Sequence, residues 1–171
     1  MFLSVEYMKI RNADLIKDKQ TLLDFHCVIN YESGSPILRK KYTFEQFRGI
    51  WMIGKEPNVF LSALEVSLKD SRTIVEIWED DDGTPIAYVW VGFEDWPDYK
   101  ATGAEIRDIM VAKAYQRKGI ATQIINRVEK LARERGATLL RSGTGVQNMA
   151  SRELHAKLGF STSWMQFEKE I

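Results

Sequence analysis

A strand-like segment, a short basic loop and an amphipathic segment follow one another between residues 105 and 135, and this order strongly constrains the fold. Residues Glu105–Val111 are mostly apolar or β-branched and favour a strand. After the loop Gln116–Ala121, apolar residues recur at helical spacing up to about Arg135. These residues are Ile120, Ile124, Val128 and Leu131. A strand that leads into such a helix begins a β–α–β unit, so the sequence predicts a sheet covered by helices.

The loop Gln116–Ala121 has the composition of an anion-binding turn. The first N–H groups of a helix have no partner within the helix and lie at the positive end of its dipole, so they bind phosphate. Gly119 lets the backbone approach a ligand closely, and the small Ala121 keeps the helix start accessible. Arg117 and Lys118 add two cationic side chains. Taken alone, the same six residues also fit an ordinary solvated turn.

Hydrophobic periodicity predicts further helices and strands on either side of this unit. The expected helices are Lys17–Asn30, Thr43–Ile53, Asn58–Leu68 and Asn148–Leu158; the expected strands are Phe2–Ile10, Thr73–Trp78, Pro85–Phe93, Thr138–Ser142 and Ser163–Lys169. Pro85–Phe93 is apolar almost throughout, which is typical of a strand buried on both faces. Asp80–Gly83 predicts a hairpin turn rather than a calcium loop, which needs more ligands at fixed spacing. We expect a loop over Glu94–Gly103 and, for His26, a place at the edge of the core.

Composition excludes several classes of protein. The chain has 171 residues, enough for one domain with a proper core. Its 24 Lys and Arg balance 24 Asp and Glu, which argues against a nucleic-acid binder. Its one cysteine cannot form an internal disulfide, and its two histidines lack the spacing of zinc ligands, so we expect no metal. No apolar run approaches the roughly 18 residues that span a bilayer, so we expect a cytoplasmic protein without a membrane partner.

Three separated elements agree in order and spacing with one known family. They are the strand Glu105–Val111 with its Gln-x-x-Gly-x-Ala loop, the helix and strand that follow, and Asn148 with the segment Leu154–Phe160. Together they resemble the GNAT superfamily of N-acetyltransferases over about the last 90 residues. Two residues depart from the family pattern: Ser151 replaces an alanine, and His155 stands where a tyrosine is usual.

The resemblance implies an α/β fold with a mixed sheet of about six to seven strands and about four helices, in which splayed central strands hold acetyl-CoA. We expect one domain over residues 1–171, with a variable acceptor-side part in 1–70 and the acetyl-CoA-binding core in 71–171. The implied activity is that of an N-acyltransferase (EC 2.3.1 type) in which a primary amine attacks acetyl-CoA directly within a ternary complex. The acceptor can be a small amine or a protein amino group, and the habit of the family allows a homodimer.

The resemblance also assigns the acetyl-CoA site. The backbones of Ile109 and Val111 would pair with pantetheine, and an amide in the segment that includes Met110 would polarise the thioester carbonyl. Asn148 would bind the arm of the cofactor, and it is also a candidate helix N-cap. The expected pyrophosphate-binding residues are Gln116, Arg117, Lys118, Gly119, Ile120, Ala121 and Thr122.

Catalysis requires a base for the ammonium group of the acceptor and a proton donor for the leaving thiolate. By resemblance Glu105 is the favoured base. Asp108 is an alternative that strand alternation places on the opposite face, and acids in Glu94–Asp98 or ordered water are others. His155 would donate the proton in place of tyrosine, or would only pack near the sulfur.

Other functions fit parts of the sequence. The departure at His155 leaves a non-catalytic acyl-CoA-binding or sensing module as an alternative, and a scaffold for protein interaction is a third. Gly143–Asn148 resembles a dinucleotide fingerprint, but too little chain follows it for the usual unit. Acidic and aromatic residues in Glu94–Tyr99, together with Trp51 and Trp78, would suit a cationic amine, or the loop is simply solvated.

Overall fold

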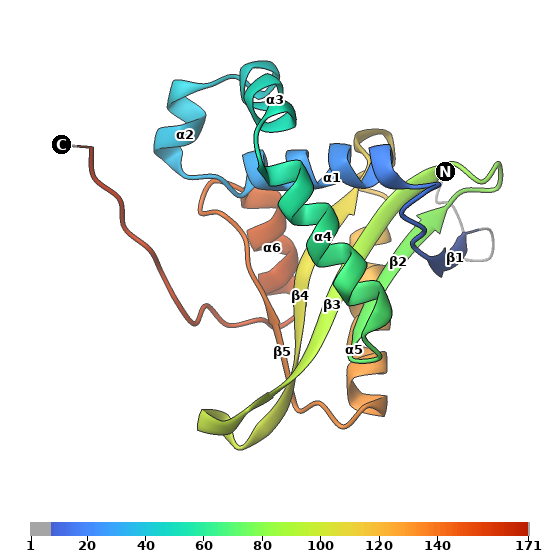
Figure 1. Ribbon diagram of the computed structural model, residues 1–171. Helices are drawn as coiled ribbons and strands as arrows, with labels where there is room; N and C mark the ends of the chain where they lie inside the picture. Colours follow the sequence, from blue (N-terminus) through green and yellow to red (C-terminus); the bar gives the residue numbers. More distant parts are fainter. Residues whose placement is uncertain (1–7, 171) are drawn as a thin grey trace.

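A mixed five-stranded β-sheet runs through the protein, with helices on both of its faces (Figure 1). The computed structural model describes residues 8–170. The strands lie in sequence order and are β1 (Lys9–Asn12), β2 (Thr73–Glu79), β3 (Pro85–Trp96), β4 (Ala101–Val111) and β5 (Leu139–Ser142). Neighbours from β1 to β4 are antiparallel, whereas β5 runs parallel to β4.

The helices divide between two hydrophobic cores, one on each face of the sheet. The α-helices of the described part are α1 (Lys19–Glu32), α2 (Pro36–Lys41), α3 (Phe44–Ile53), α4 (Glu56–Lys69), α5 (Ile120–Glu134) and α6 (Met149–Lys157). Helices α1, α3 and α4 contribute Leu22, Trp51 and Leu64 to the core on one face. The stripe of α5 packs on the other face, where α6 adds partly buried leucines. This arrangement confirms the predicted α/β fold, with five described strands instead of six or seven.

Strand β3 contributes to both cores. Residues Ile86–Phe93 are all buried, and from residue 87 to residue 91 alternate side chains belong to opposite cores: Val89 and Val91 face α5, while Tyr88 and Trp90 face α1 and α4. The prediction of a strand buried on both faces is confirmed. Asp80–Gly83 forms the predicted turn between β2 and β3, with the Gly83 N–H donating to the Asp80 carbonyl at 3.0 Å.

Local signals set where two of the helices begin. Thr43 caps α3 in a capping box with Gln46, as the helix prediction from Thr43 requires. Helix α2 was not expected from the sequence, because its six residues are too few to show a hydrophobic period. Its start does carry a recognisable signal: Ser35 accepts a hydrogen bond from the Leu38 N–H, and Pro36 occupies the first turn.

One sequence prediction is wrong at the ends of two strands. Glu94–Gly103 is not a loop, since β3 continues to Trp96 and β4 already begins at Ala101, so that both strands extend into a long hairpin. A Cβ at Gly103 would lie 2.2 Å from the Trp96 ring, so the lack of a side chain lets the indole cover the strand there. The predicted first strand, Phe2–Ile10, lies mostly outside the described residues, and its end overlaps β1.

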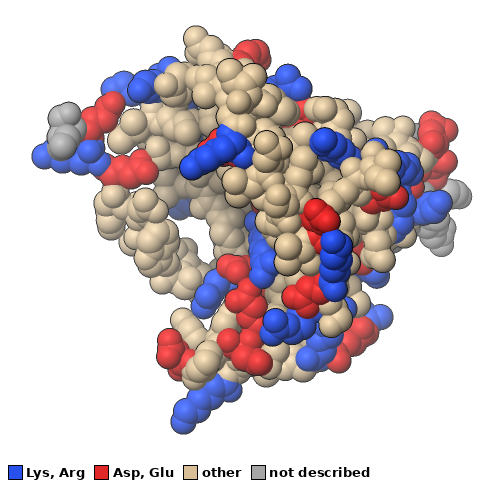
Figure 2. Space-filling view, in the orientation of Figure 1, with Lys and Arg blue, Asp and Glu red and all other residues tan. Residues whose placement is uncertain are grey.

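The predicted last strand, Ser163–Lys169, pairs with no described strand. This segment is extended, leaves the body of the protein after α6 (Figure 1), and exposes 74% of Trp164 and 87% of Phe167. Its β-favouring residues therefore lack a partner strand within residues 8–170. Figure 2 shows the same segment standing apart, and positive and negative side chains interspersed over this face of the molecule.

Candidate functional site

Strands β4 and β5 separate halfway along β4. Their parallel ladder begins at Gly103 and Leu139 and ends where Ile106 faces Ser142, although β4 continues to Val111. The Ala112 N–H donates to the Ile86 carbonyl of β3, so by alternation the backbone of Met110 also faces β3. Ile109 and Val111 then direct their backbone groups toward the side that β5 has left. This is the splay expected from the sequence, with Met110 turned away from it.

The loop after β4 presents a row of free donors. Arg117 and Gly119 both have positive φ, 63° and 84°, and α5 begins at Ile120. The first helical bond runs from the Gln123 N–H to the Gly119 carbonyl. Within residues 8–170, none of the six backbone N–H groups from Arg117 to Thr122 donates a hydrogen bond. Consecutive N–H groups in such a conformation form a concave site that suits an anion.

Neighbouring side chains hold this loop in place. Gln116 Nε2 donates to the Val111 carbonyl at 3.0 Å, so its side chain braces the loop against β4. Tyr115 Oη donates to Asp80 Oδ2 at 2.6 Å and lowers the pKa of that carboxyl. Lys118 Nζ lies 4.9 Å from the centre of the Tyr115 ring. Asp80 thus anchors the loop to the β2–β3 turn. In the described part of the chain, no group of three or more His, Cys, Asp or Glu side chains could hold a metal ion.

A β-bulge in β4 changes which side chains face the acceptor side. Trp90 pairs with Asp108 and Val91 with Ile106, so Arg107 is an extra residue. Glu105, opposite Gly92, and Asp108, opposite Trp90, therefore lie on the same face of the sheet. The prediction that they lie on opposite faces is wrong, because simple alternation does not survive a bulge.

Asp108 is buried in a polar cluster that sequence reasoning missed. One carboxylate oxygen, Oδ2, lies 2.6 Å from His26 Nδ1 of α1 and accepts a hydrogen bond from the Tyr88 hydroxyl of β3. The Asp108 side chain is 7% exposed and that of His26 21%. Burial and the adjacent carboxylate raise the pKa of Tyr88 well above its usual value, so its hydroxyl stays a donor. No local pattern could join His26 to a residue 82 positions later.

A groove of about 510 Å³ lies beside Glu105 on this face. Helix α1 contributes Ile29 and Ser33, and Glu105–Arg107 and the loop Gly143–Gly145 complete the lining. Gly145 packs so closely on α1 that a Cβ would lie 2.5 Å from the Ser33 carbonyl oxygen. The groove thus depends on contact between α1 and the β5–α6 loop.

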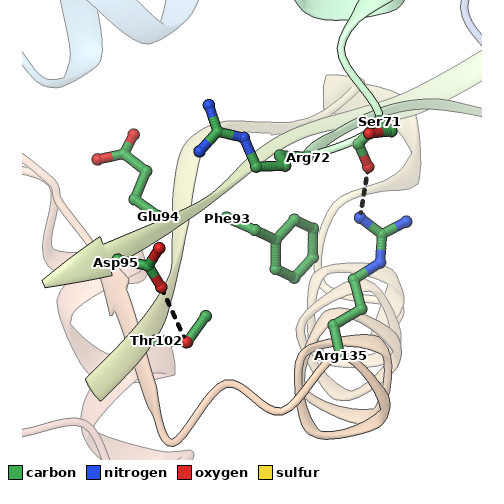
Figure 3. A pocket seen from close by; sticks show the side chains of 7 residues that line it. All are labelled: Ser71, Arg72, Phe93, Glu94, Asp95, Thr102 and Arg135. Carbon is green, nitrogen blue, oxygen red and sulfur yellow. Dashed lines mark hydrogen bonds between the residues drawn. The ribbon is translucent and has the colours of Figure 1, made fainter. Parts of the chain in front are cut away.

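A second hollow, of about 370 Å³, shares no lining residue with the groove beside Glu105 (Figure 3). Its lining is Ser71, Arg72, Phe93, Glu94, Asp95, Thr102 and Arg135. There Arg135 donates to the Ser71 carbonyl and Thr102 to Asp95, both at 3.1 Å. It includes Glu94 and Asp95, from the segment expected to offer alternative bases, but none of the expected acetyl-CoA-binding residues and neither Glu105 nor His155, so we do not include it in the candidate site.

The aromatic residues expected to meet a cationic acceptor are already engaged. The Arg141 guanidinium carbon lies 4.1 Å from the Trp96 ring centre and 5.7 Å from that of Tyr99. Trp51 and Trp78 are core residues with exposures of 5% and 3%. Arg141 of the same chain therefore makes the cation–π contacts that the sequence suggested for a substrate amine.

Two residues of the C-terminal half complete the site. Asn148 caps α6, its side chain accepting from the Ser151 N–H at 3.2 Å. His155 Nδ1 lies 2.7 Å from the Ser151 carbonyl oxygen, which can only accept, so Nδ1 is a donor. Its other ring nitrogen, Nε2, is buried and has no hydrogen-bond partner among the described residues.

Comparison of the sequence with known proteins assigns it to one family. The sequence model of the acetyltransferase (GNAT) family matches residues 38–160. An uncharacterized N-acetyltransferase of Methanocaldococcus jannaschii is 28% identical over 99 residues, 52% of this chain and 42% of the relative. A type 1 aminoglycoside N(6')-acetyltransferase of Serratia marcescens is 36% identical over 58 residues, 34% of this chain and 40% of the relative. The matched segments thus span less than half of either relative.

Solved structures show the same fold. An aminoglycoside antibiotic 6'-N-acetyltransferase from Acinetobacter baumannii superposes with a TM-score of 0.67 at 20% identity, covering 96% of this chain and 99% of the other. At that identity the likeness concerns the fold alone. No helix within residues 8–170 has the length and apolar character needed to cross a membrane.

Proposed function

Since this chain belongs to the GNAT family of acetyltransferases, we propose that it transfers the acetyl group of acetyl-CoA to a primary amine held in the groove beside Glu105. The observation that carries this proposal is the row of six free N–H groups from Arg117 to Thr122, next to the point where β4 and β5 separate. Acetyl-CoA would use both features: the loop would bind its pyrophosphate, and the unpaired strand edge would bind its pantetheine.

The residues present fit acetyl-CoA as a co-substrate. The loop would hold the pyrophosphate through backbone N–H groups, with Arg117 and Lys118 adding positive charge. Ile109 and Val111 would offer backbone groups to the pantetheine, and the Asn148 side chain would combine its N-cap bond with a contact to the same arm. We propose that the unit is a single domain over residues 1–171, in which 1–70 shapes the acceptor side and 71–171 binds the donor.

Acid–base roles follow from position and hydrogen bonding. Glu105, the base that the family resemblance favours, lines the groove, where its carboxylate would attract the acceptor ammonium. His155 is our candidate donor to the thiolate, through Nε2. Because Nδ1 already carries a proton, Nε2 of the neutral ring is an acceptor, and it can donate only once the ring is doubly protonated.

A small amine fits the groove better than a folded protein surface, because about 510 Å³ corresponds to a small-molecule site. The match to an aminoglycoside acetyltransferase over 58 residues supports the same choice of a compact amine. We place the reaction in the cytoplasm, where acetyl-CoA is made available to such enzymes, and a homodimer is compatible with this proposal.

Calorimetric titration of acetyl-CoA into the native chain and a Gly119→Glu variant tests the donor site. We expect binding by the native chain and its loss in the variant, because the new carboxylate would repel the pyrophosphate. An amine panel assayed by release of the CoA thiol then tests transfer. Absence of binding by the folded native chain contradicts the proposal, whereas binding without amine-dependent release supports a non-catalytic acyl-CoA-binding module.

A further inference from the structure

We propose that His26 is a catalytic base for the acceptor amine and that Asp108 positions its ring, an inference that rests on the proposed acetyl transfer. The carboxylate of Asp108 lies 2.6 Å from His26 Nδ1, and the Tyr88 hydroxyl donates to the same oxygen. A histidine that is hydrogen-bonded through one nitrogen to a buried carboxylate is oriented for proton transfer through the other.

The contacts determine which ring nitrogen can accept a proton. A carboxylate oxygen can only accept, so His26 Nδ1 must donate to Asp108. In the neutral ring the lone pair then lies on Nε2. No described residue forms a hydrogen bond with Nε2, and this atom is not among the buried polar atoms that lack a partner. The free nitrogen is therefore not completely buried, and the His26 side chain is 21% exposed.

Aromatic packing fixes the plane of this ring. Phe60 of α4 stacks on His26 with centroids 3.8 Å apart and planes 5° apart. Trp51 of α3 lies at 5.9 Å on a tilted plane. Residues of α3, α4 and β4 thus contact this one imidazole ring of α1 and restrain its orientation.

The position of the pair relates it to both halves of the proposed reaction. Asp108 immediately precedes Ile109, whose backbone faces the side that β5 has left. Arg107 precedes it and lines the acceptor groove, as does Ile29, which lies one helical turn after His26 on α1. The pair therefore adjoins, along the chain, residues that line the groove and a residue of the separated strand. Glu105, by contrast, lies where β4 still pairs with β5.

The step balances without a further reactant. His26 Nε2 takes one proton from the acceptor ammonium, which leaves a neutral amine. That amine forms a C–N bond to the acetyl carbonyl carbon while the C–S bond of the thioester breaks. The nitrogen gives up its second proton, the thiolate gains one, and His26 returns its proton to solvent.

Nitrogen-detected NMR of the imidazole rings tests the inference without any acceptor. The chain has only two histidines, so a His155→Gln variant assigns both rings. We expect the Nδ1–H tautomer at His26, and a change in its Nε2 signal when acetyl-CoA binds. In Asp108→Asn, the new amide group would donate to Nδ1 and move the proton to Nε2. An Nε2–H tautomer in the native chain, or a signal indifferent to bound acetyl-CoA, would overturn the proposal.

Kinetics with an amine from the panel supply the second readout. Asp108→Asn and His26→Phe, which keeps a ring against Phe60, should lower kcat by about 10² or more with little change in the KM for acetyl-CoA. Unchanged kcat in variants that are folded by circular dichroism would assign the cluster to structure alone and refute the proposal. Failure of acetyl-CoA to bind the native chain would overturn the proposed function and this inference together, whereas a normal kcat in these variants overturns only the inference.

Discussion

Replacement of Gly119 by alanine separates backbone strain from ligand binding, because the same helix provides a matched control. Gly119 precedes α5 with φ 84°, and Gly136 follows it with φ 78°. A Cβ built at either position meets no other atom within 4 Å. The two substitutions therefore share one source of strain, the left-handed backbone conformation, and differ in which end of α5 they alter.

The expected loss of stability is small and equal in the two variants. A side chain in the left-handed region costs about 1–2 kcal/mol, and about 0.4–1 kcal/mol is offset because alanine restricts the unfolded chain. The net loss is about 1 kcal/mol, or about 2–4 °C in Tm for a chain of this size. Thermal unfolding of both variants measures it.

Affinity for acetyl-CoA should distinguish them. At Gly119 the new methyl group stands among the free N–H groups of the loop and would displace one or two of their bonds to phosphate, at about 1.5–3 kcal/mol each. We expect Kd to rise at least about tenfold in Gly119→Ala and to stay unchanged in Gly136→Ala, by calorimetry. Equal affinities in two equally destabilised variants would refute the assignment of this loop to the pyrophosphate.

Four further predictions concern stability and chemistry. Arg11 lies 2.6 Å from Asp18 and 2.7 Å from Glu79, so Arg11→Met should cost about 3 kcal/mol in urea denaturation, because buried Asp18 loses its paired cation and Glu79 keeps only the exposed Lys17 at 3.0 Å; a loss below about 1 kcal/mol would contradict it. Burial raises the pKa of Asp18 and Glu79, but the hydrogen bonds from Arg11 lower it further, so the net shift is downward. The stabilisation that these two carboxylates contribute is therefore present above about pH 4 and should be lost on acidification, which pH-dependent melting can follow. Deletion of residues 161–171 should change the free energy of unfolding by less than about 1 kcal/mol, since residues 161–170 are exposed; a larger loss by the same assay would reveal packing. His155→Ala should lower kcat roughly tenfold or more and leave acetyl-CoA affinity unchanged, and an unaltered kcat would remove His155 from the chemistry.

Elements with strong local signals could be predicted from the sequence. The stripe of α5, the apolar run of β3 and the cap at Thr43 each encode their structure within a few residues, and the structure confirms all three. Helix α2 and the extended β3–β4 hairpin were missed for the opposite reason. The former is shorter than two turns, and polar residues between Glu94 and Gly103 hide strands that depend on cross-strand packing.

The residues of the candidate site also divide into those with a local sequence signal and those without one. The loop proposed for the pyrophosphate lies within one stretch of sequence, so the sequence alone is enough to propose its residues. The polar cluster joins His26, Tyr88 and Asp108 from three distant elements, and only the folded chain brings them together. For Trp96 and Tyr99 the sequence suggested a ligand, but in the structure their cationic partner is Arg141 of the same chain.

One extra residue in β4 arranges the acceptor side of this site. If Arg107 took a regular strand position instead of forming the bulge, alternation would place Asp108 on the face of Ile106, in the core beneath α5. With the bulge, Asp108 and Glu105 share the α1 face, while Ile109 still packs against the α5 core. The bulge also follows directly on Ile106, the last residue of β4 that pairs with β5. The same irregularity therefore exposes the strand edge proposed for the donor and turns an acid toward the groove proposed for the acceptor, so that donor and amine would meet at Asp108 and Ile109.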